Sequence, residues 1–266
     1  MFTVAERDGL RAALISAARA DERITGVALT GSASGGSGSG GSGLIDGEDR
    51  WSDIDLAFGF AAGTDLGEAI DEWTAVMYAR HGAVHHLDII SGGATYRVFL
   101  LASTLQVDLA FAPEAEFGAT APTFRLLSGK AVPRVQTAPP DAAELIGLAW
   151  LYGLHARSSI ARGRLWQAEY MVSGVRDRVL ALACLRHGLP AVQGRGIDRL
   201  PPGVTGPLAG ALVRTLEGAE LARAFLVATE ALLTEIGQVD AALAGHLAGT
   251  LRELARPVLP VRNGPA

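Results

Sequence analysis

The pattern of apolar residues along this chain changes once, at the adjacent prolines Pro139 and Pro140, and that change limits the fold more than any other feature. Before the prolines, short strand candidates are interleaved with amphipathic helices, whereas after them the pattern is helical. This order predicts an α/β (α+β) protein with two domains. We expect a small mixed β-sheet domain over residues 1–138 and a C-terminal helical bundle domain over residues 139–266.

Local spacing of apolar residues predicts the individual elements. In the first domain we expect helices over 3–20 and 66–80, and strands over 24–30, 53–60, 84–91, 96–101 and 105–112, the last two as a hairpin. In the second domain we expect helices over 141–160, 164–187, 206–217 and 219–250. The apolar stripe at 219–250 is typical of a core or of an interface between two copies, so a homodimer stays open.

Composition agrees with a folded chain of this size. Of its 266 residues, 49% are apolar and 19% are charged, which supports a sizeable core and excludes wholesale disorder. A net charge of −5 argues against a nucleic-acid partner. The single Cys184 excludes an intramolecular disulfide and a cysteine-based zinc site. The longest apolar run, 145–154, is too short to span a membrane and no signal-peptide pattern is present, so we expect a cytoplasmic protein.

Residues 31–43 consist only of glycine, serine and one alanine. Within them, 35–43 (GGSGSGGSG) has the composition of a flexible linker, although the stretch separates two early strands and not two domains. We interpret the loop at 34–43 as an engineered insertion, with a natural low-complexity insertion as the alternative. A chain of this composition predicts poor order at 35–43, because it has high conformational entropy and no side chains to bury.

The strongest chemical signal is the run Ser52-Asp53-Ile54-Asp55 at the start of a strand. Side chains alternate along a strand, so Asp53 and Asp55 point to one face. Two neighbouring carboxylates repel each other, and a divalent cation is the natural neutraliser. Oxygen ligands favour Mg²⁺ over zinc. The alternative is a strand end with two solvated aspartates.

A third carboxylate, Asp108, lies inside the otherwise apolar strand 105–112. Aspartate is depleted in strands and is almost never buried alone. If this strand is a neighbour of 53–60, three carboxylates converge and can hold two metal ions, the arrangement of phosphoryl transfer. Asp88 is a rival for the third position, ranked second because its strand is less uniformly apolar.

Gly31-Ser32 ends the strand before the aspartate pair, where a glycine lets the backbone approach a phosphate. Together with Ser52, Asp53, Asp55 and Asp108, this order resembles the nucleotidyltransferases of the DNA-polymerase-β superfamily over about residues 10–130. The resemblance implies that Gly31, Ser32 and Ser52 bind nucleotide and that the aspartates hold Mg²⁺. It also implies transfer of a nucleoside monophosphate, usually AMP from ATP, to a hydroxyl, with release of pyrophosphate. Relatives join the two motifs by a shorter loop, which puts triphosphate affinity in doubt.

The run from Arg162 to Tyr170, followed by Arg176-Asp177, resembles the second domain of aminoglycoside and lincosamide nucleotidyltransferases and their actinobacterial relatives. The resemblance implies that Glu169 is the general base toward the acceptor hydroxyl and that Arg176 contacts the nucleotide. The alternative for Glu169 is a surface residue paired with Arg176 or Arg162. Arg195 and Asp198 lie in a glycine-rich loop to which no role is assigned.

The function expected from these residues is Mg²⁺-dependent transfer of a nucleotide from ATP or another nucleoside triphosphate to a small hydroxyl-bearing acceptor. An acidic site suits a cationic acceptor such as an aminoglycoside. Two alternatives stay open: a protein or RNA acceptor, and a catalytically impaired nucleotide-binding or antitoxin-like module. The sequence holds no zincin, α/β-hydrolase or P-loop motif.

Overall fold

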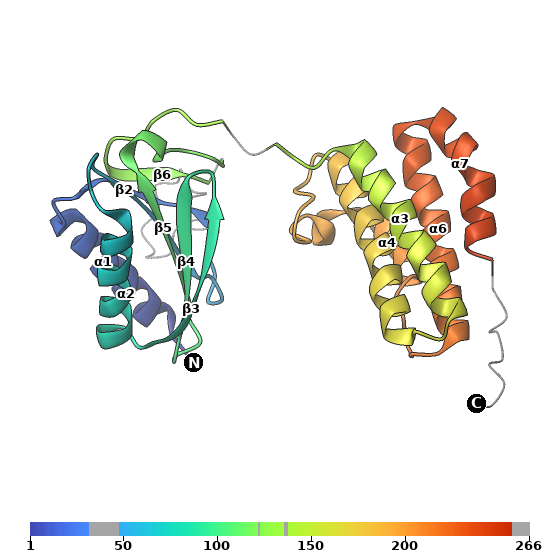
Figure 1. The fold of residues 1–266 in the computed structure, drawn as a ribbon, viewed down its shortest axis with the longest axis horizontal. Coiled ribbons are helices and arrows are strands. Elements are labelled where there is room, and N and C mark those ends of the chain that lie inside the picture. The colour runs from blue at the N-terminus through green and yellow to red at the C-terminus, as the bar shows by residue number, and fades with distance from the viewer. Residues whose placement is uncertain (32–47, 122, 136–137, 257–266) are drawn as a thin grey trace. The chain divides into compact units, whose positions relative to one another are not determined.

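The computed structural model describes residues 1–31, 48–121, 123–135 and 138–256. The chain divides into two compact units, Met1–Thr137 and Ala138–Ala266 (Figure 1). The predicted class, a mixed sheet with helices followed by a helical part, is confirmed. Ser32 and the tract 35–43 lie outside the described residues, so the expected disorder of that tract stays a prediction.

In its described residues, the first unit contains two helices, six strands and a short 3-10 turn. In chain order these are α1 (Val4–Ala20), β1 (Ile24–Leu29), β2 (Ile54–Phe60), α2 (Leu66–Arg80), β3 (Ala83–Ser91), β4 (Ala94–Leu101), β5 (Gln106–Pro113), η2 (Glu114–Glu116) and β6 (Arg125–Gly129). Helix α1 begins at a capping box between Thr3 and Glu6, and α2 begins at Asp65, whose carboxylate accepts from the Glu68 amide.

The six strands form one sheet in the order β3-β4-β5-β2-β1-β6. Strands β2 and β5 are its parallel pair, and their register sets Asp55 opposite Asp108. Strands β1 and β2 are antiparallel, so the end of β1 lies beside the start of β2. The predicted hairpin of β4 and β5 is present as an antiparallel pair. This topology brings the end of β1 and the starts of β2 and β5 together.

Helices α1 and α2 both pack against one face of the sheet, where they cover the main apolar core of this unit (Figure 1). Aromatic rings fill its centre: the ring centroid of Phe58 lies 4.8 Å from that of Trp73 and 5.8 Å from that of Phe111. Packed rings of this kind contribute beyond their buried area. The helix-covered face is therefore the rigid support of strands β2 and β5.

The opposite face of the sheet is lined by small residues. Ala57 and Ala110 belong to a separate buried cluster there, together with Phe117. Phe117 lies so close to Gly26 and Gly59 that a Cβ at either glycine would overlap its ring. Because side chains alternate, Asp55 and Asp108 share this second face with Ala57 and Ala110.

The second unit is helical, with one further 3-10 turn. Its described elements are α3 (Ala142–Ala161), α4 (Leu165–Arg186), η3 (Ile197–Arg199), α5 (Pro202–Ala209), α6 (Gly218–Val239) and α7 (Ala241–Leu254). The Asp141 carboxylate accepts from the Glu144 amide and caps α3, as its position after Pro140 predicts. Two clusters of buried apolar residues form the core between the helices.

Two helix predictions for this unit were wrong in detail. The expected helix 219–250 is broken at Asp240, whose backbone is extended and whose carboxylate accepts from the Leu243 amide to begin α7. The expected helix 206–217 starts earlier and stops at Ala209. Beyond this end, the Arg223 guanidinium donates to the carbonyl oxygens of Gly210 and Leu212, at 2.6 and 3.0 Å.

One strand of the sheet was not predicted. Strand β6 has five residues and pairs with β1 at the edge of the sheet. A stretch this short carries too little alternation to be recognised from the sequence. No helix in the described ranges is both long and apolar enough to cross a membrane.

Candidate functional site

Three carboxylates meet at the edge of the sheet where β2 and β5 begin. Asp53 precedes β2, Asp55 is on β2, and Asp108 is its direct neighbour on β5. One carboxylate oxygen from each residue lies within 4.8 Å of the other two. The structure thus brings together the three acids on which the sequence argument depends.

This donor set fits Mg²⁺. The three groups offer only carboxylate oxygens, the ligands that hard divalent cations prefer. Ligands on opposite sides of one Mg²⁺ are about 4.2 Å apart, because each bond is about 2.1 Å long. The observed upper limit of 4.8 Å is close to that span. Small side-chain rotations would therefore close the three oxygens around an ion.

The environment of Asp108 disfavours its charged form. Burial raises the pKa of Asp108 to about 6, and the neighbouring Asp53 carboxylate adds to the rise, while a hydrogen bond from Gln106 opposes it. The Gln106 amide nitrogen lies 3.0 Å from Asp108 Oδ1 and 3.3 Å from Asp53 Oδ2. A carboxyl group with such a pKa lacks a full counter-charge, which a divalent cation supplies.

Gly31 lies directly against the Asp55 carboxylate. Its φ of +66° is in the left-handed region that favours glycine. A Cβ at this position would overlap Asp55 Oδ2. Both the conformation and the close approach therefore require glycine where β1 ends beside β2, and the backbone of Gly31 becomes part of the wall of the carboxylate cluster.

Ser52 takes part in a turn before the cluster. Its hydroxyl donates to Asp49 Oδ1 at 3.2 Å and accepts from the Asp49 amide at 3.0 Å. The amide of Trp51 donates to the same Asp49 carboxylate at 2.8 Å. Ser32, the other serine expected to bind nucleotide, lies outside the described residues.

Asp88, the rival third carboxylate, lies elsewhere in the sheet. It is on β3, which is separated from β2 by β4 and β5. Its carboxylate receives two hydrogen bonds from the Arg97 guanidinium, each 2.7 Å long. These bonds lower the pKa of Asp88. Asp88 is therefore an ion-pair partner of Arg97 and not a member of the cluster.

Glu169 and Arg176 belong to α4 in the helical unit. Ser173 Oγ donates to Glu169 Oε1 at 2.7 Å, and Arg176 pairs with Asp177 at 2.9 Å. Within the described part of the chain, no ion pair joins Glu169 to Arg176 or Arg162, so the pairing offered as its alternative role is absent. The catalytic role of Glu169 and the nucleotide contact of Arg176 stay predictions.

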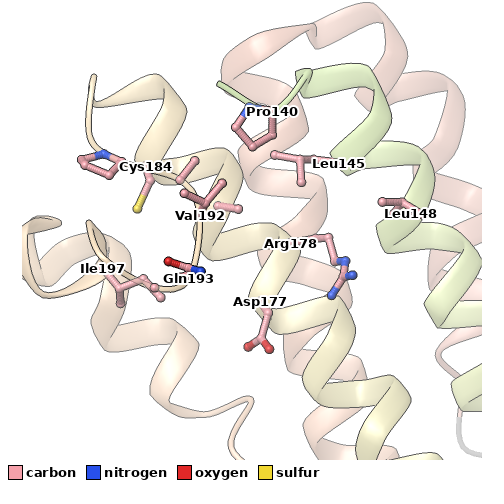
Figure 2. Close-up of a pocket in the computed structure, with 13 residues that line it drawn as sticks. Pro140, Leu145, Leu148, Asp177, Arg178, Cys184, Val192, Gln193 and Ile197 are labelled. Carbon is pink, nitrogen blue, oxygen red and sulfur yellow. The ribbon is translucent and has the colours of Figure 1, made fainter. Parts of the chain in front are cut away.

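A cavity of about 510 Å³ lies within the helical unit (Figure 2). Leu145 and Leu148 of α3 line one side, and Val192 of the loop after α4 and Ile197 of η3 line another. Arg178 is its cationic lining residue, and the guanidinium carbon lies 4.3 Å from the Tyr152 ring centroid. Neither Arg195 nor Asp198 is among the lining residues, and their roles stay unassigned.

Sequence reasoning missed several residues near the carboxylate cluster. Gln106 could have been found, because it lies two positions before Asp108 and so shares its face of the strand. Arg7 and Glu48 could not, because their pairing joins segments far apart in the chain. Nothing local in the sequence marks either residue.

Comparison with known proteins shows a distant structural similarity. No protein-family model matches the chain, and no curated protein matches it. Among solved structures it is similar to an aminoglycoside 6-adenyltransferase from Bacillus subtilis, with 13% sequence identity and a TM-score of 0.39. The match covers 94% of this chain and 98% of that one. At this TM-score the likeness carries no argument about chemistry, so function is argued from the residues of this chain.

Proposed function

We propose that this chain is a Mg²⁺-dependent nucleotidyltransferase that moves a nucleoside monophosphate, from ATP or another nucleoside triphosphate, to a hydroxyl of a small molecule. The observation that carries the proposal is the convergence of Asp53, Asp55 and Asp108 within 4.8 Å. A second support is Gly31, whose backbone lies so close to the Asp55 carboxylate that no side chain fits between them. The starts of β2 and β5, together with Gly31 just after the end of β1, thus form one compact acidic site.

The reaction forms a bond between the acceptor oxygen and the α-phosphorus, and breaks the bond from that phosphorus to the bridging oxygen of the leaving pyrophosphate. Bound Mg²⁺ would screen the charges of the triphosphate and lower the pKa of the acceptor hydroxyl. Asp53 and Asp55 would hold the ion beside the triphosphate, and Asp108 the ion beside the acceptor. Gln106, bonded to Asp53 and Asp108, would orient both carboxylates.

The proton of the acceptor hydroxyl needs a base. Glu169 is the candidate in the helical unit, and the hydrogen bond from Ser173 holds its carboxylate in one orientation. Arg176 is the candidate contact to the nucleotide, although Asp177 also binds it.

The acceptor class is proposed from charge. A net charge of −5 favours a cationic, hydroxyl-bearing molecule. An aminoglycoside- or lincosamide-like antibiotic has these properties, which also agree with the family resemblance of the sequence. A library of such acceptors, assayed for pyrophosphate release with each of the four nucleoside triphosphates, would identify the substrate pair.

The mechanism is tested by Asp108→Asn, which keeps the size of the side chain and removes its charge. Because Asp108 is assigned to the acceptor side, Mg-nucleotide affinity should change little, whereas turnover should fall by about a hundredfold or more. Asp55→Asn should weaken both. The measurements are calorimetric titration with Mg-nucleotide and pyrophosphate release. Asp71→Asn, which changes a carboxylate on the surface of the same unit, is the matched control.

Two results would contradict the proposal. If the wild-type protein binds no Mg-nucleotide, the site is not a nucleotidyl-transfer centre. If Asp108→Asn leaves turnover intact, the acceptor-side role of this residue is wrong, because no other carboxylate in the described ranges completes the cluster.

A further inference from the structure

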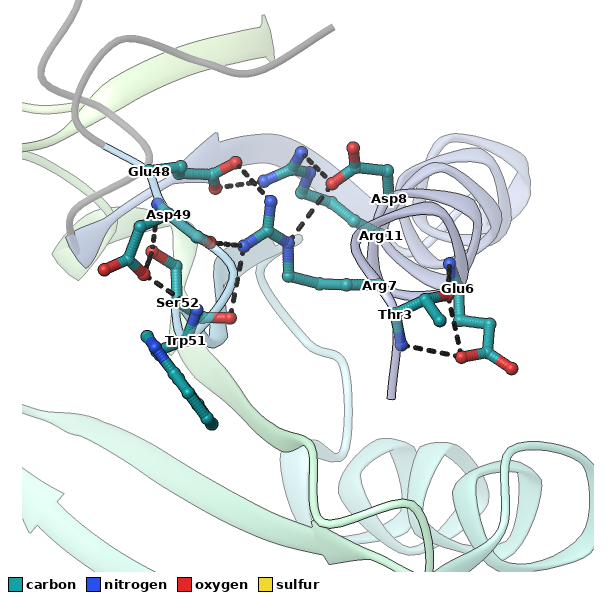
Figure 3. Close-up of polar contacts among 9 residues, drawn as sticks. All are labelled: Thr3, Glu6, Arg7, Asp8, Arg11, Glu48, Asp49, Trp51 and Ser52. Atoms are coloured by element: carbon teal, nitrogen blue, oxygen red, sulfur yellow. Dashed lines mark hydrogen bonds and ion pairs between the residues drawn. The ribbon is translucent and has the colours of Figure 1, made fainter. Parts of the chain in front are cut away.

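A fully buried arginine lies beside the segment that delivers Asp53. Arg7, in the first turns of α1, has 0% of its side chain exposed. Buried arginines are rare and need partners for every N–H group. Figure 3 shows the Arg7 guanidinium directed from the helix toward residues 48–52, far along the chain. The buried Arg7 side chain therefore connects α1 to residues 48–52, the entry segment that leads into β2.

The Arg7 guanidinium joins three separate points of this entry segment. One terminal nitrogen donates to the carbonyl oxygen of Asp49 at 2.6 Å and to that of Ser52 at 3.3 Å. The other terminal nitrogen donates to Glu48 Oε2 at 3.0 Å. Only the planar, forked guanidinium can make these contacts at once.

Two further charged groups complete the cluster. Arg11, one turn further along α1, binds the other oxygen of the fully buried Glu48 carboxylate. Asp8 accepts from Arg7 Nε at 3.2 Å and from Arg11 at 2.8 Å. Two cations therefore face two anions, and the charges balance within the cluster (Figure 3).

The contacts end one residue before Asp53. On the N-terminal side of Asp53, Arg7 donates to the carbonyl oxygen of Ser52, and the turn from Asp49 to Ser52 adds its own hydrogen bonds. On its C-terminal side, Ile54 is fully buried and in register with Val107 of β5. The backbone of Asp53 is thus held from both directions, which limits where its carboxylate can point.

We propose that Arg7 is a positioning residue for the metal site: through Glu48 and the two carbonyl groups, it fixes the backbone that presents Asp53 to Asp55 and Asp108. The inference rests on the proposed function, because it assumes that the three aspartates bind a divalent cation. A purely structural role is the poorer explanation, since buried ion pairs contribute little net stability compared with apolar residues of similar volume.

The test uses the full chain and Mn²⁺ as the probe, with free Mn²⁺ followed by electron paramagnetic resonance. Arg7→Lys keeps the charge beside Glu48 but cannot reach all three acceptors, so Mn²⁺ affinity should fall by about fivefold or more. Arg7→Gln should lower it by about tenfold or more. Arg19, an exposed arginine of the same helix, supplies the controls Arg19→Lys and Arg19→Gln, whose affinities should stay within about twofold of wild type.

Amide hydrogen exchange separates positioning from general loss of stability. In folded Arg7→Lys, exchange should rise at residues 49–55 and stay unchanged in the core strand β5. If Arg7→Gln fails to fold, Arg7→Lys decides the question. A folded Arg7→Lys protein with wild-type Mn²⁺ affinity would overturn the inference, as would faster exchange spread over the whole unit.

The same titration distinguishes failure of the inference from failure of the proposed function. If wild type binds Mn²⁺ and Asp55→Asn does not, while Arg7→Lys binds as wild type does, only the positioning role of Arg7 is wrong. If wild type itself does not bind Mn²⁺, the metal site and the inference fall together.

Discussion

At the scale of single residues, the site depends on what lies close to the aspartate carboxylates. Gly31 lies close to Asp55 because it has no side chain, and burial together with the neighbouring Asp53 carboxylate opposes the ionisation of Asp108. Burial of Asp108 beside Asp53 costs stability when its carboxyl group is ionised and no ligand is present. Such costs are common where a site is shaped for binding.

Gly31→Ala should damage the site more than the fold. An alanine at φ +66° is strained by about 1–2 kcal/mol, and its Cβ would also displace the Asp55 carboxylate. We therefore expect Mn²⁺ affinity to fall by about tenfold or more. Gly63→Ala is the matched control, because Gly63 has φ +86° but nothing within 4 Å of a Cβ. Equal Mn²⁺ affinity in the two variants would contradict this expectation.

The raised pKa of Asp108 predicts a pH dependence of the metal-free protein. The carboxyl has a pKa of about 6 when folded and about 3.8 ordinarily, so the folded state binds more protons between these values. Stability from this group is therefore present below about pH 4 and is lost as the pH rises through 6. The melting temperature of wild type relative to Asp108→Asn should increase as the pH falls from 7 to 5.

Saturating Mg²⁺ is the control for that measurement. A bound cation favours the ionised carboxylate, so the difference between wild type and Asp108→Asn should no longer increase toward acid pH. A melting difference that stays flat with pH in the absence of metal would contradict the assigned pKa.

At the scale of elements, the site lies where the end of β1 meets the starts of β2 and β5. Helix α1 supports it through the contacts of Arg7 and Arg11 with Glu48. The two ends of the segment between β1 and β2 are both held: Gly31 lies against Asp55, and Glu48 is bound by Arg7 and Arg11. What lies between these two points in the sequence should therefore matter little for the geometry of the aspartates.

Lengthening the Gly/Ser tract tests this view. Insertion of six further Gly and Ser residues after Gly43 should leave Mn²⁺ affinity within about twofold of wild type, because six added residues raise the entropic cost of loop closure by well under about 1 kcal/mol. Metal titration and thermal melting measure the two quantities. A tenfold loss of Mn²⁺ affinity would mean that the tract itself contributes to the metal site.

At the scale of the whole molecule, two units carry two separate cores. The clusters of buried residues in Ala138–Ala266 draw only on helices and loops of that unit, and Leu232 and Phe225 are large buried members of them. A unit of this size that buries its own apolar surface meets the usual condition for independent folding.

A fragment of residues 138–266 should therefore fold alone, with a helical circular-dichroism spectrum and a cooperative thermal melt. Leu232→Ala in the fragment should lower its stability by about 2–5 kcal/mol, because it leaves a cavity in the core. A non-cooperative melt that this substitution does not change would show that the unit depends on the rest of the chain.

Much of the fold could be predicted from the sequence because it depends on neighbours in the chain. Alternation along a strand predicted that Asp53 and Asp55 share a face, and a capping residue after two prolines predicted the start of α3. The break at Asp240 escaped prediction because the apolar pattern continues across it, although aspartate is a typical N-cap.

Local pattern could not decide which strands are neighbours. Asp88 and Asp108 both lie on strands, and only the sheet order makes β5, and not β3, the partner of β2. The pairing of Arg7 with Glu48 likewise joins residues that no periodicity connects. Strand pairing and buried ion pairs depend on contacts between distant segments, whereas helix periodicity, alternation and caps act within a few residues. By itself, the sequence determined which side chains could bind a metal, and the tertiary structure decided which of them meet.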